Sequence, residues 1–220
     1  MDPLLNLLLF VALIVCIMLI ALYRTNFDTI GIFSPINRAD TSPWTLHEFI
    51  SLKPSKRASR VYYRFNEENV RSHAHRYLGR FDTAILHWEE SPILDYIIER
   101  KFPANRLPDS IKEEDMFQAG LYALALAESG VSAREAKLVT IYCLQDEARR
   151  CLEKNTPGKC WKCSNGRRFV RRYNEREIEK YLKKADEVWY HKRKPKPSPS
   201  DKKCRLCPYS RDGSCNYSAV

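Results

Sequence analysis

The stretch GRFDTAILHWEESPILDYIIERKF, from Gly79 to Phe102, decides the fold that this sequence predicts. Its pattern predicts two short apolar strands joined by the polar turn HWEES. Asp82 lies in the first strand, and the second strand ends in Glu99, Arg100 and Lys101. Charges at strand positions about to be buried cost free energy unless something binds them. The hairpin therefore predicts both a sheet and a binding site at its edge.

The charged residues of this hairpin favour metal chemistry. Residues two apart on a strand share a face, so Glu99 and Lys101 point the same way, and the hairpin brings Asp82 beside them. Two carboxylates at one sheet edge can hold a hard divalent ion such as Mg²⁺. Such an ion polarises a phosphate, and a neighbouring lysine stabilises the developing charge. The alternative is an exposed strand end with ordinary surface charges.

The rest of the chain alternates between helical and strand patterns. Residues 113–130 predict a helix, because acids occupy its first turn and Gly130 ends it. A shorter helix is expected to start with Ser42 as N-cap and Pro43 as its first residue. Strands are predicted over residues 59–66, 69–86, 136–144 and 167–174, and an amphipathic helix over 175–193. This order predicts a mixed α/β domain with a central sheet.

The N-terminal segment Leu4–Tyr23 is apolar, with one Asn and no charge. A helix of about 20 such residues spans the hydrocarbon core of a bilayer. The long run and the absence of Lys or Arg from Met1–Pro3 favour an uncleaved anchor over a secretory signal. Because Arg24 and Arg38 follow the run, the positive-inside rule predicts a single-pass membrane protein with a cytoplasmic catalytic domain.

Composition also suggests where the domains end. We expect an anchor over residues 1–24, a linker over 25–42 and the α/β domain over 43–193. Residues 194–220 are expected to form a Pro-rich linker and a Cys-rich metal-binding tail.

The charge balance suggests an anionic partner. The chain has 37 Lys and Arg against 27 Asp and Glu, a net charge of +10. Residues 146–220 supply most of this excess, which fits a surface that follows nucleic-acid phosphates. The alternative is a solvated basic helix and tail. The residues expected to hold substrate phosphates are Arg167, Arg168, Arg171 and Arg172.

Three motifs occur in order: G-x-x-D at Gly79–Asp82, E-x-K at Glu99–Lys101, and Q-x-x-x-Y at Gln118–Tyr122. With the cysteine tail, they resemble the RecB-like branch of the PD-(D/E)XK nucleases, and most of all the small iron–sulfur exonucleases associated with CRISPR adaptation. The resemblance covers about Trp44 to Cys215. It implies a restriction-endonuclease-like fold, a central mixed sheet flanked by helices, and a metal-dependent DNA exonuclease.

The resemblance also implies roles for the matched residues. Asp82 and Glu99 would bind Mg²⁺ or Mn²⁺, Lys101 would be the catalytic lysine, and Gln118 and Tyr122 would border the site and the DNA.

The family uses a further metal ligand upstream of these motifs, a His or Glu. His47, on the first expected helix, is the favoured candidate. His75 is the second, because a strand would place it and His73 on one face beside Asp82. Asp95 could instead be a structural carboxylate of the hairpin.

Cysteine spacing predicts a second metal site. Cys204-x-x-Cys207 followed by Cys215 can wrap one ion or cluster. The similar family holds a [4Fe–4S] cluster with three C-terminal cysteines and one near the N-terminus. No cysteine lies between Cys16 and Cys143, so the fourth ligand is expected at Cys160 or Cys163. The alternative is a zinc site of Cys160, Cys163, Cys204 and Cys207, and Cys143 and Cys151 are expected to be ordinary thiols.

Three functions remain in competition. The first is a membrane-anchored, metal-dependent DNA nuclease. The second is a non-catalytic module that binds nucleic acid or a partner and has a structural zinc or iron–sulfur site. The third is a protein whose basic face binds anionic lipids at a membrane surface. The intact set of Asp82, Glu99 and Lys101 favours the nuclease.

Overall fold

The structure is a computed structural model of the 220-residue chain. It describes residues 11–19, 33–52, 61–153, 160–194 and 196–220. The chain forms two compact units, Met1–Ile178 and Glu179–Val220, which are treated separately below.

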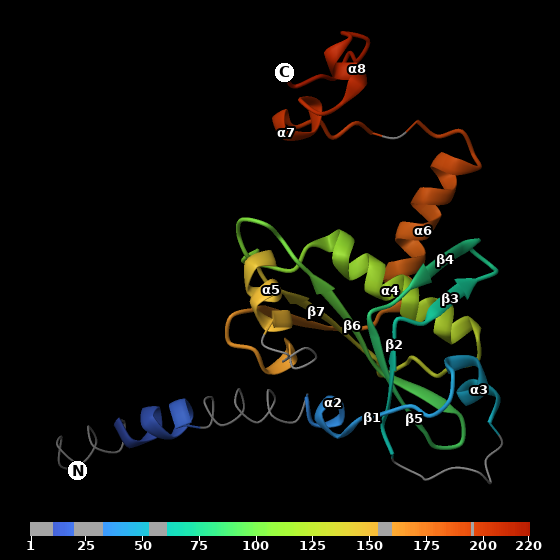
Figure 1. The fold of residues 1–220 in the computed structure, drawn as a ribbon, viewed down its shortest axis with the longest axis vertical. Helices are drawn as coiled ribbons and strands as arrows, with labels where there is room; N and C mark the ends of the chain where they lie inside the picture. Colours follow the sequence, from blue (N-terminus) through green and yellow to red (C-terminus); the bar gives the residue numbers. More distant parts are fainter. Residues whose placement is uncertain (1–10, 20–32, 53–60, 154–159, 195) are drawn as a thin grey trace, which may run out of the picture. The chain divides into compact units, whose positions relative to one another are not determined.

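The first unit is built on a six-stranded mixed sheet (Figure 1). Its strands, in order across the sheet, are β1 (Asp40–Thr41), β2 (Tyr63–Asn66), β5 (Thr83–Trp88), β6 (Pro92–Lys101), β7 (Lys137–Tyr142) and β8 (Arg167–Arg172). β1 is parallel to β2 and β6 to β7, while the other neighbours are antiparallel. The expected mixed α/β domain with a central mixed sheet is therefore present.

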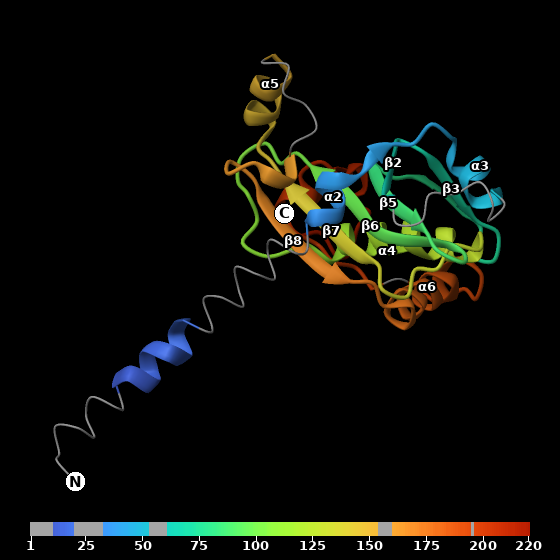
Figure 2. The same cartoon turned by 90° about the horizontal axis from the view of Figure 1, so that it is seen from below.

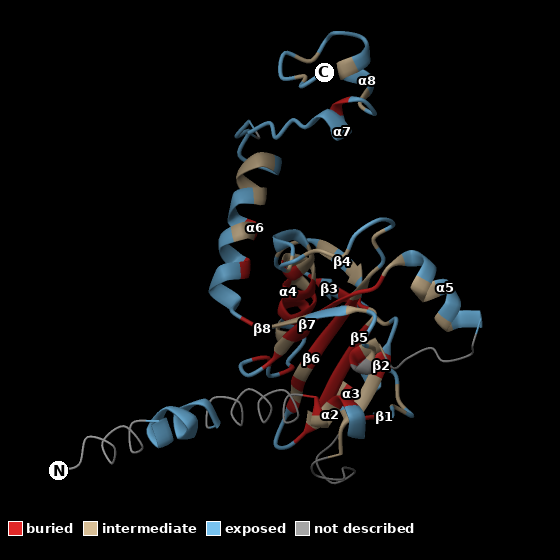
Figure 3. Ribbon diagram, turned by 90° about the vertical axis from the view of Figure 1, so that its left-hand side faces the viewer, coloured by how far each residue is buried: buried red, intermediate tan, exposed pale blue. Residues whose placement is uncertain are grey.

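The predicted hairpin is β5–β6. Its register pairs Thr83 with Ile98, and a bulge lies between Ile85 and Leu86. Most residues of both strands are buried, on both faces of the sheet, and Figure 3 shows burial concentrated on the central strands. Short apolar runs bounded by turn residues are typical of such central strands.

The expected single strand over residues 69–86 is wrong. Residues 69–80 form a separate hairpin of β3 (Asn69–Ser72) and β4 (Tyr77–Arg80), and β5 begins at Thr83. His73 and His75 lie in the turn between β3 and β4 and not in a strand.

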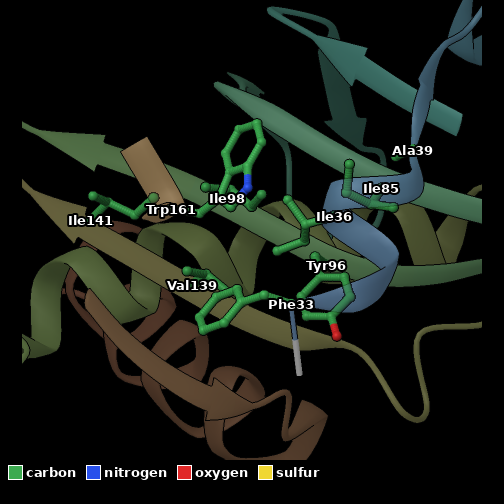
Figure 4. Close-up of a cluster of buried hydrophobic side chains, with 9 residues drawn as sticks. All are labelled: Phe33, Ile36, Ala39, Ile85, Tyr96, Ile98, Val139, Ile141 and Trp161. Carbon is green, nitrogen blue, oxygen red and sulfur yellow. The ribbon is translucent and has the colours of Figure 1, made fainter. Parts of the chain in front are cut away.

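The sheet separates two different environments (Figures 1 and 2). On one face the long helix α4 (Glu113–Glu128) packs against β6 and β7. On the other, α2 (Ser34–Arg38) contributes Ile36 to a core with Ile98, Val139 and Trp161, which Figure 4 shows. Because side chains alternate along β6, Ile98 faces α2, whereas Glu99 and Lys101 face α4.

The remaining helices are short or peripheral. They are α3 (Leu46–Ser51), α5 (Gln145–Glu153), the 3₁₀ helix η2 (Cys160–Lys162), α6 (Glu175–Trp189), α7 (Asp201–Cys204) and α8 (Pro208–Arg211). Helix α3 starts later than expected: its N-cap is Thr45, which forms a capping box with Glu48, and not Ser42.

The predicted membrane anchor is wrong. Within the described residues, every helix is too short or too polar to traverse a bilayer. Of the expected anchor, residues 1–24, the structure describes residues 11–19, which are helical. The rest of that segment lies outside the described residues. Because the anchor is not supported, the predicted single-pass membrane topology with a cytoplasmic catalytic domain is not supported either.

The second unit contains the end of α6 and the short helices α7 and α8. Ser200 caps α7 by accepting a hydrogen bond from the backbone N–H of Lys203. Cys204 is buried in this unit, and its Sγ accepts from the backbone N–H of Ala219 at 3.4 Å.

Candidate active site

Asp82 and Glu99 meet at the end of the β5–β6 hairpin. The carboxylate of Asp82 accepts a hydrogen bond from the backbone N–H of Arg100 at 2.6 Å. The backbone N–H of Asp82 in turn donates to Glu99 Oε1 at 3.4 Å. The hairpin register, which pairs Thr83 with Ile98, places the two acidic residues opposite each other. The predicted pair of carboxylates therefore comes together.

Glu99 is an unusual carboxyl group, because it is only 2 % exposed. Burial, and then the charge of Asp82, raise its pKa from 4.5 to about 7, while Lys101 works in the opposite direction. A bound cation would favour its ionised form. Near neutral pH Glu99 can therefore gain or lose a proton.

Lys101 shares the face of Glu99, as the strand pattern predicts. Its Nζ donates to Gln118 Oε1 at 2.6 Å and to Glu99 Oε2 at 3.3 Å, and it lies 3.7 Å from Asp115 Oδ1. Gln118 Nε2 donates to the Tyr122 hydroxyl at 2.7 Å. All five matched motif residues, Asp82, Glu99, Lys101, Gln118 and Tyr122, therefore belong to one connected group.

Helix α4 explains this connection. Asp115, Gln118 and Tyr122 are three and four residues apart, so they lie on one face of the helix. That face lies toward β6, where Lys101 is located. Asp115 was not expected from the sequence. Its spacing of three residues from Gln118 would have placed it on the same helix face. Acidic residues in the first turn of a helix are common, however, because they interact favourably with the helix dipole.

The predicted upstream histidines lie elsewhere. His47 is exposed on α3 and lines a pocket of about 420 Å³ with Glu68 and Arg71. His75 Nε2 lies 4.0 Å from Glu128 Oε1. In the described chain neither histidine forms a hydrogen bond or ion pair with Asp82 or Glu99.

Asp95 lies at the other end of the β5–β6 hairpin. Its Oδ2 is 2.6 Å from His87 Nδ1, and Glu89 Oε1 lies 3.6 Å from His87 Nε2. The hydrogen bond to the Asp95 carboxylate raises the pKa of His87, and burial raises the pKa of Asp95. This placement fits the alternative of a structural carboxylate.

The predicted phosphate-binding arginines occupy both faces of β8. Their partners across the β7–β8 ladder show which face each takes: Arg167 and Arg171 lie on the α4 face with Lys101, and Arg168 and Arg172 lie on the α2 face. Arg167 binds Asp109, Arg168 donates to the Trp161 carbonyl, and Arg172 binds Glu135. Arg171 is exposed. The four do not form one continuous surface.

The predicted cysteine ligands belong to different units. Cys160 and Cys163 lie in the first unit, and Cys204, Cys207 and Cys215 lie in the second. Over the described ranges, no three His, Cys, Asp or Glu side chains are grouped so as to hold a metal ion. The iron–sulfur or zinc site therefore remains a prediction.

In the first unit, Cys143 has other thiols as neighbours. Burial raises the pKa of Cys143, and nearby Cys163, Cys151 and Cys160 raise it further.

Comparison with known proteins adds no relative: no protein-family model matches the chain, and no curated protein matches it. The function must therefore be argued from the motifs and from the geometry of the site.

Proposed function

We propose that this chain is a divalent-metal-dependent deoxyribonuclease that hydrolyses phosphodiester bonds at the site of Asp82, Glu99 and Lys101, acting as an exonuclease. The observation that carries the proposal is the buried Glu99 carboxyl group beside Asp82, with Lys101 on the same face. Burying the Glu99 carboxylate beside the half-buried Asp82 costs free energy, and a bound cation would offset that cost.

The donor set fits Mg²⁺ or Mn²⁺. Asp82 and Glu99 would hold the ion, which binds proteins through one or two carboxylates together with water and substrate phosphates. When bound, the ion would polarise the phosphate and lower the pKa of a water molecule that it binds.

The chain's own groups supply positioning and charge. Lys101 would donate hydrogen bonds to the phosphate oxygens and stabilise the negative charge that develops on them. Gln118 holds the Lys101 ammonium at 2.6 Å, and the Tyr122 hydroxyl holds Gln118. Lys101 is thereby fixed before substrate arrives, so less ordering is needed at the transition state.

The test uses the full chain with end-labelled single- and double-stranded DNA and with RNA, in Mg²⁺, Mn²⁺ or EDTA. Glu99→Gln and Lys101→Met should each lower DNA cleavage by about 100-fold or more. The matched controls Glu113→Gln and Lys112→Met, both exposed, should cleave as the wild type does. Cleavage that survives in EDTA, or equally in all variants, would refute the proposal.

Other outcomes assign the chain differently. Faster cleavage of RNA than of DNA would change the substrate class. Salt-sensitive DNA binding without cleavage would favour the non-catalytic nucleic-acid-binding module.

A further inference from the structure

Asp115 lies at the edge of the candidate site and has no role in the motifs. Its side chain is 15 % exposed, and its Oδ1 lies 3.7 Å from Lys101 Nζ. Its other oxygen, Oδ2, accepts a hydrogen bond from the Tyr142 hydroxyl at 2.6 Å. Asp115 therefore joins the lysine to a residue on the next strand.

Tyr142 fixes Asp115 in place. The tyrosine is 1 % exposed, and its hydroxyl also accepts a hydrogen bond from the backbone N–H of Lys112 at 3.2 Å. Burial raises the pKa of Tyr142, so the hydroxyl keeps its proton and remains a donor. The carboxylate is thus held from one side by a phenol that cannot itself move.

The β6–β7 register explains why these groups meet. Lys101 and Tyr142 are direct partners across two parallel strands, so their side chains share a face. The first turn of α4 lies over that face and supplies Asp115. Acceptors from β6 and α4 therefore surround the ammonium group, and β7 supplies the tyrosine that holds one of them.

The position of Lys101 depends on which acceptors surround it. Glu99 Oε2 lies 3.3 Å from the Nζ on one side, and Gln118 and Asp115 lie on α4. Without Asp115, Glu99 would be the only carboxylate paired with this ammonium among the described residues. The ammonium would then be drawn toward Glu99 and out of line with the substrate phosphate.

We propose that Asp115, held by Tyr142, is a positioning residue that keeps the Lys101 ammonium between Glu99 and α4, in place for the substrate phosphate. The inference rests on the proposed nuclease function. Among the described residues Asp115 forms no hydrogen bond or ion pair with Asp82 or Glu99, and its proposed effect on the reaction runs through Lys101.

The kinetic test compares Asp115→Asn and Tyr142→Phe with Glu113→Gln, an exposed acid in the same helical turn. Asp115→Asn should lower kcat by about 10- to 100-fold, the usual effect of losing an outer-shell partner. KM for DNA and the affinity for Mn²⁺, measured by electron paramagnetic resonance, should change less than about threefold. Asp115→Glu should recover part of kcat, and Glu113→Gln should change nothing.

A second readout does not depend on cleavage. A lysine ammonium held by several acceptors exchanges its protons slowly and gives a ¹H–¹⁵N signal, which Lys101→Arg would identify. That signal should be present in the wild type and in Glu113→Gln, and lost in Asp115→Asn. Tyr142→Phe keeps the buried ring and should weaken the signal, so it serves if Asp115→Asn does not fold.

Each result bears on a different claim. A wild type that does not cleave DNA refutes the proposed function, while loss of the ammonium signal in Asp115→Asn still supports the positioning role. A signal that survives in Asp115→Asn overturns the positioning role, even in an active enzyme. Mn²⁺ affinity that falls by more than about tenfold would make Asp115 a metal ligand and would overturn it too.

Discussion

Gly79 lies directly against the ring of Tyr122: a Cβ atom at position 79 would come within 2.4 Å of Tyr122 Cε1. The Tyr122 hydroxyl accepts a hydrogen bond from Gln118, which in turn accepts one from Lys101. Gly79 of the G-x-x-D motif therefore leaves room for Tyr122 of the Q-x-x-x-Y motif. Gln118 of that same motif accepts the hydrogen bond from Lys101 of the E-x-K motif. This is a packing reason for a glycine three residues before Asp82.

We therefore expect Gly79→Ala to displace Tyr122. Overpacking of this kind costs about 1–3 kcal/mol of unfolding free energy, which urea denaturation would measure. Leu78→Ala, at an exposed neighbouring position, should change it by less than about 0.5 kcal/mol. In a double-mutant cycle with Tyr122→Leu, the two changes should be strongly non-additive, because removal of the ring removes the clash. Additive effects would show that the clash is relieved elsewhere.

The β5–β6 hairpin and α4 could be predicted because local pattern and tertiary environment agree. Both strands carry apolar runs, and most of their residues are buried in the sheet. In α4, acids at the start and Ala and Leu within suit a buried helix. For the same reason Asp82, Glu99 and Lys101 could be placed together from the sequence alone.

The β3–β4 hairpin could not be predicted, because its turn lacks the usual residues. The turn reverses with Arg76 in the left-handed region, at φ +56°, where Gly or Asn would ordinarily signal it. Asp115 was missed for another reason. Its partner Tyr142 is 27 residues away in the sequence, and only the strand register brings them together.

The raised pKa of Glu99 predicts how stability depends on pH without metal. Its pKa is about 7 in the folded chain and about 4.5 when unfolded, so the folded state binds the proton more tightly. The stability from Glu99 is fully present below pH 4.5, and it is lost as pH rises through about 7. The loss is on the order of 3 kcal/mol. Urea denaturation in EDTA between pH 4.5 and 8.5 would measure it.

Two measurements test whether Glu99 causes this loss of stability with rising pH: the Glu99→Gln variant and the addition of Mn²⁺. The glutamine variant should lose most of the pH dependence and should be more stable than the wild type at pH 8 in EDTA, because it carries no buried charge. Mn²⁺ should stabilise the wild type at pH 8 much more than the variant. Equal stabilisation of both by Mn²⁺ would place metal binding outside the Asp82–Glu99 pair.

The His87–Asp95 pair predicts a second pH effect, at the opposite end of the hairpin. The hydrogen bond to the Asp95 carboxylate raises the pKa of His87. Its stabilising contribution is therefore full below pH 6.5, the ordinary value for His, and is lost as pH rises through the higher folded value. His87→Gln should cost about 1–2 kcal/mol at pH 6 and less at pH 9, measured by urea denaturation. His73→Gln, at an exposed turn position, is the control and should change the unfolding free energy by less than about 0.5 kcal/mol.

The two faces of β8 predict which arginines would contact DNA. Arg171 is exposed on the face that also carries Lys101, whereas Arg172 lies on the opposite face and pairs with Glu135. Arg171→Gln should therefore weaken DNA binding by a similar factor for all sequences and lower the salt slope by about one phosphate contact. Arg172→Gln, the matched control, should leave both unchanged. Fluorescence anisotropy between 50 and 200 mM salt, on the order of the range in which such contacts are lost, would measure this.

The reverse pattern would have a definite meaning. Weaker binding in Arg172→Gln with no effect in Arg171→Gln would place the nucleic acid on the α2 face of the sheet. Because Glu99 and Lys101 face α4, a strand bound there could not bring its phosphate to them. That result would therefore contradict the proposed active site as well as the proposed DNA path, and it can be obtained with binding alone, without any cleavage assay.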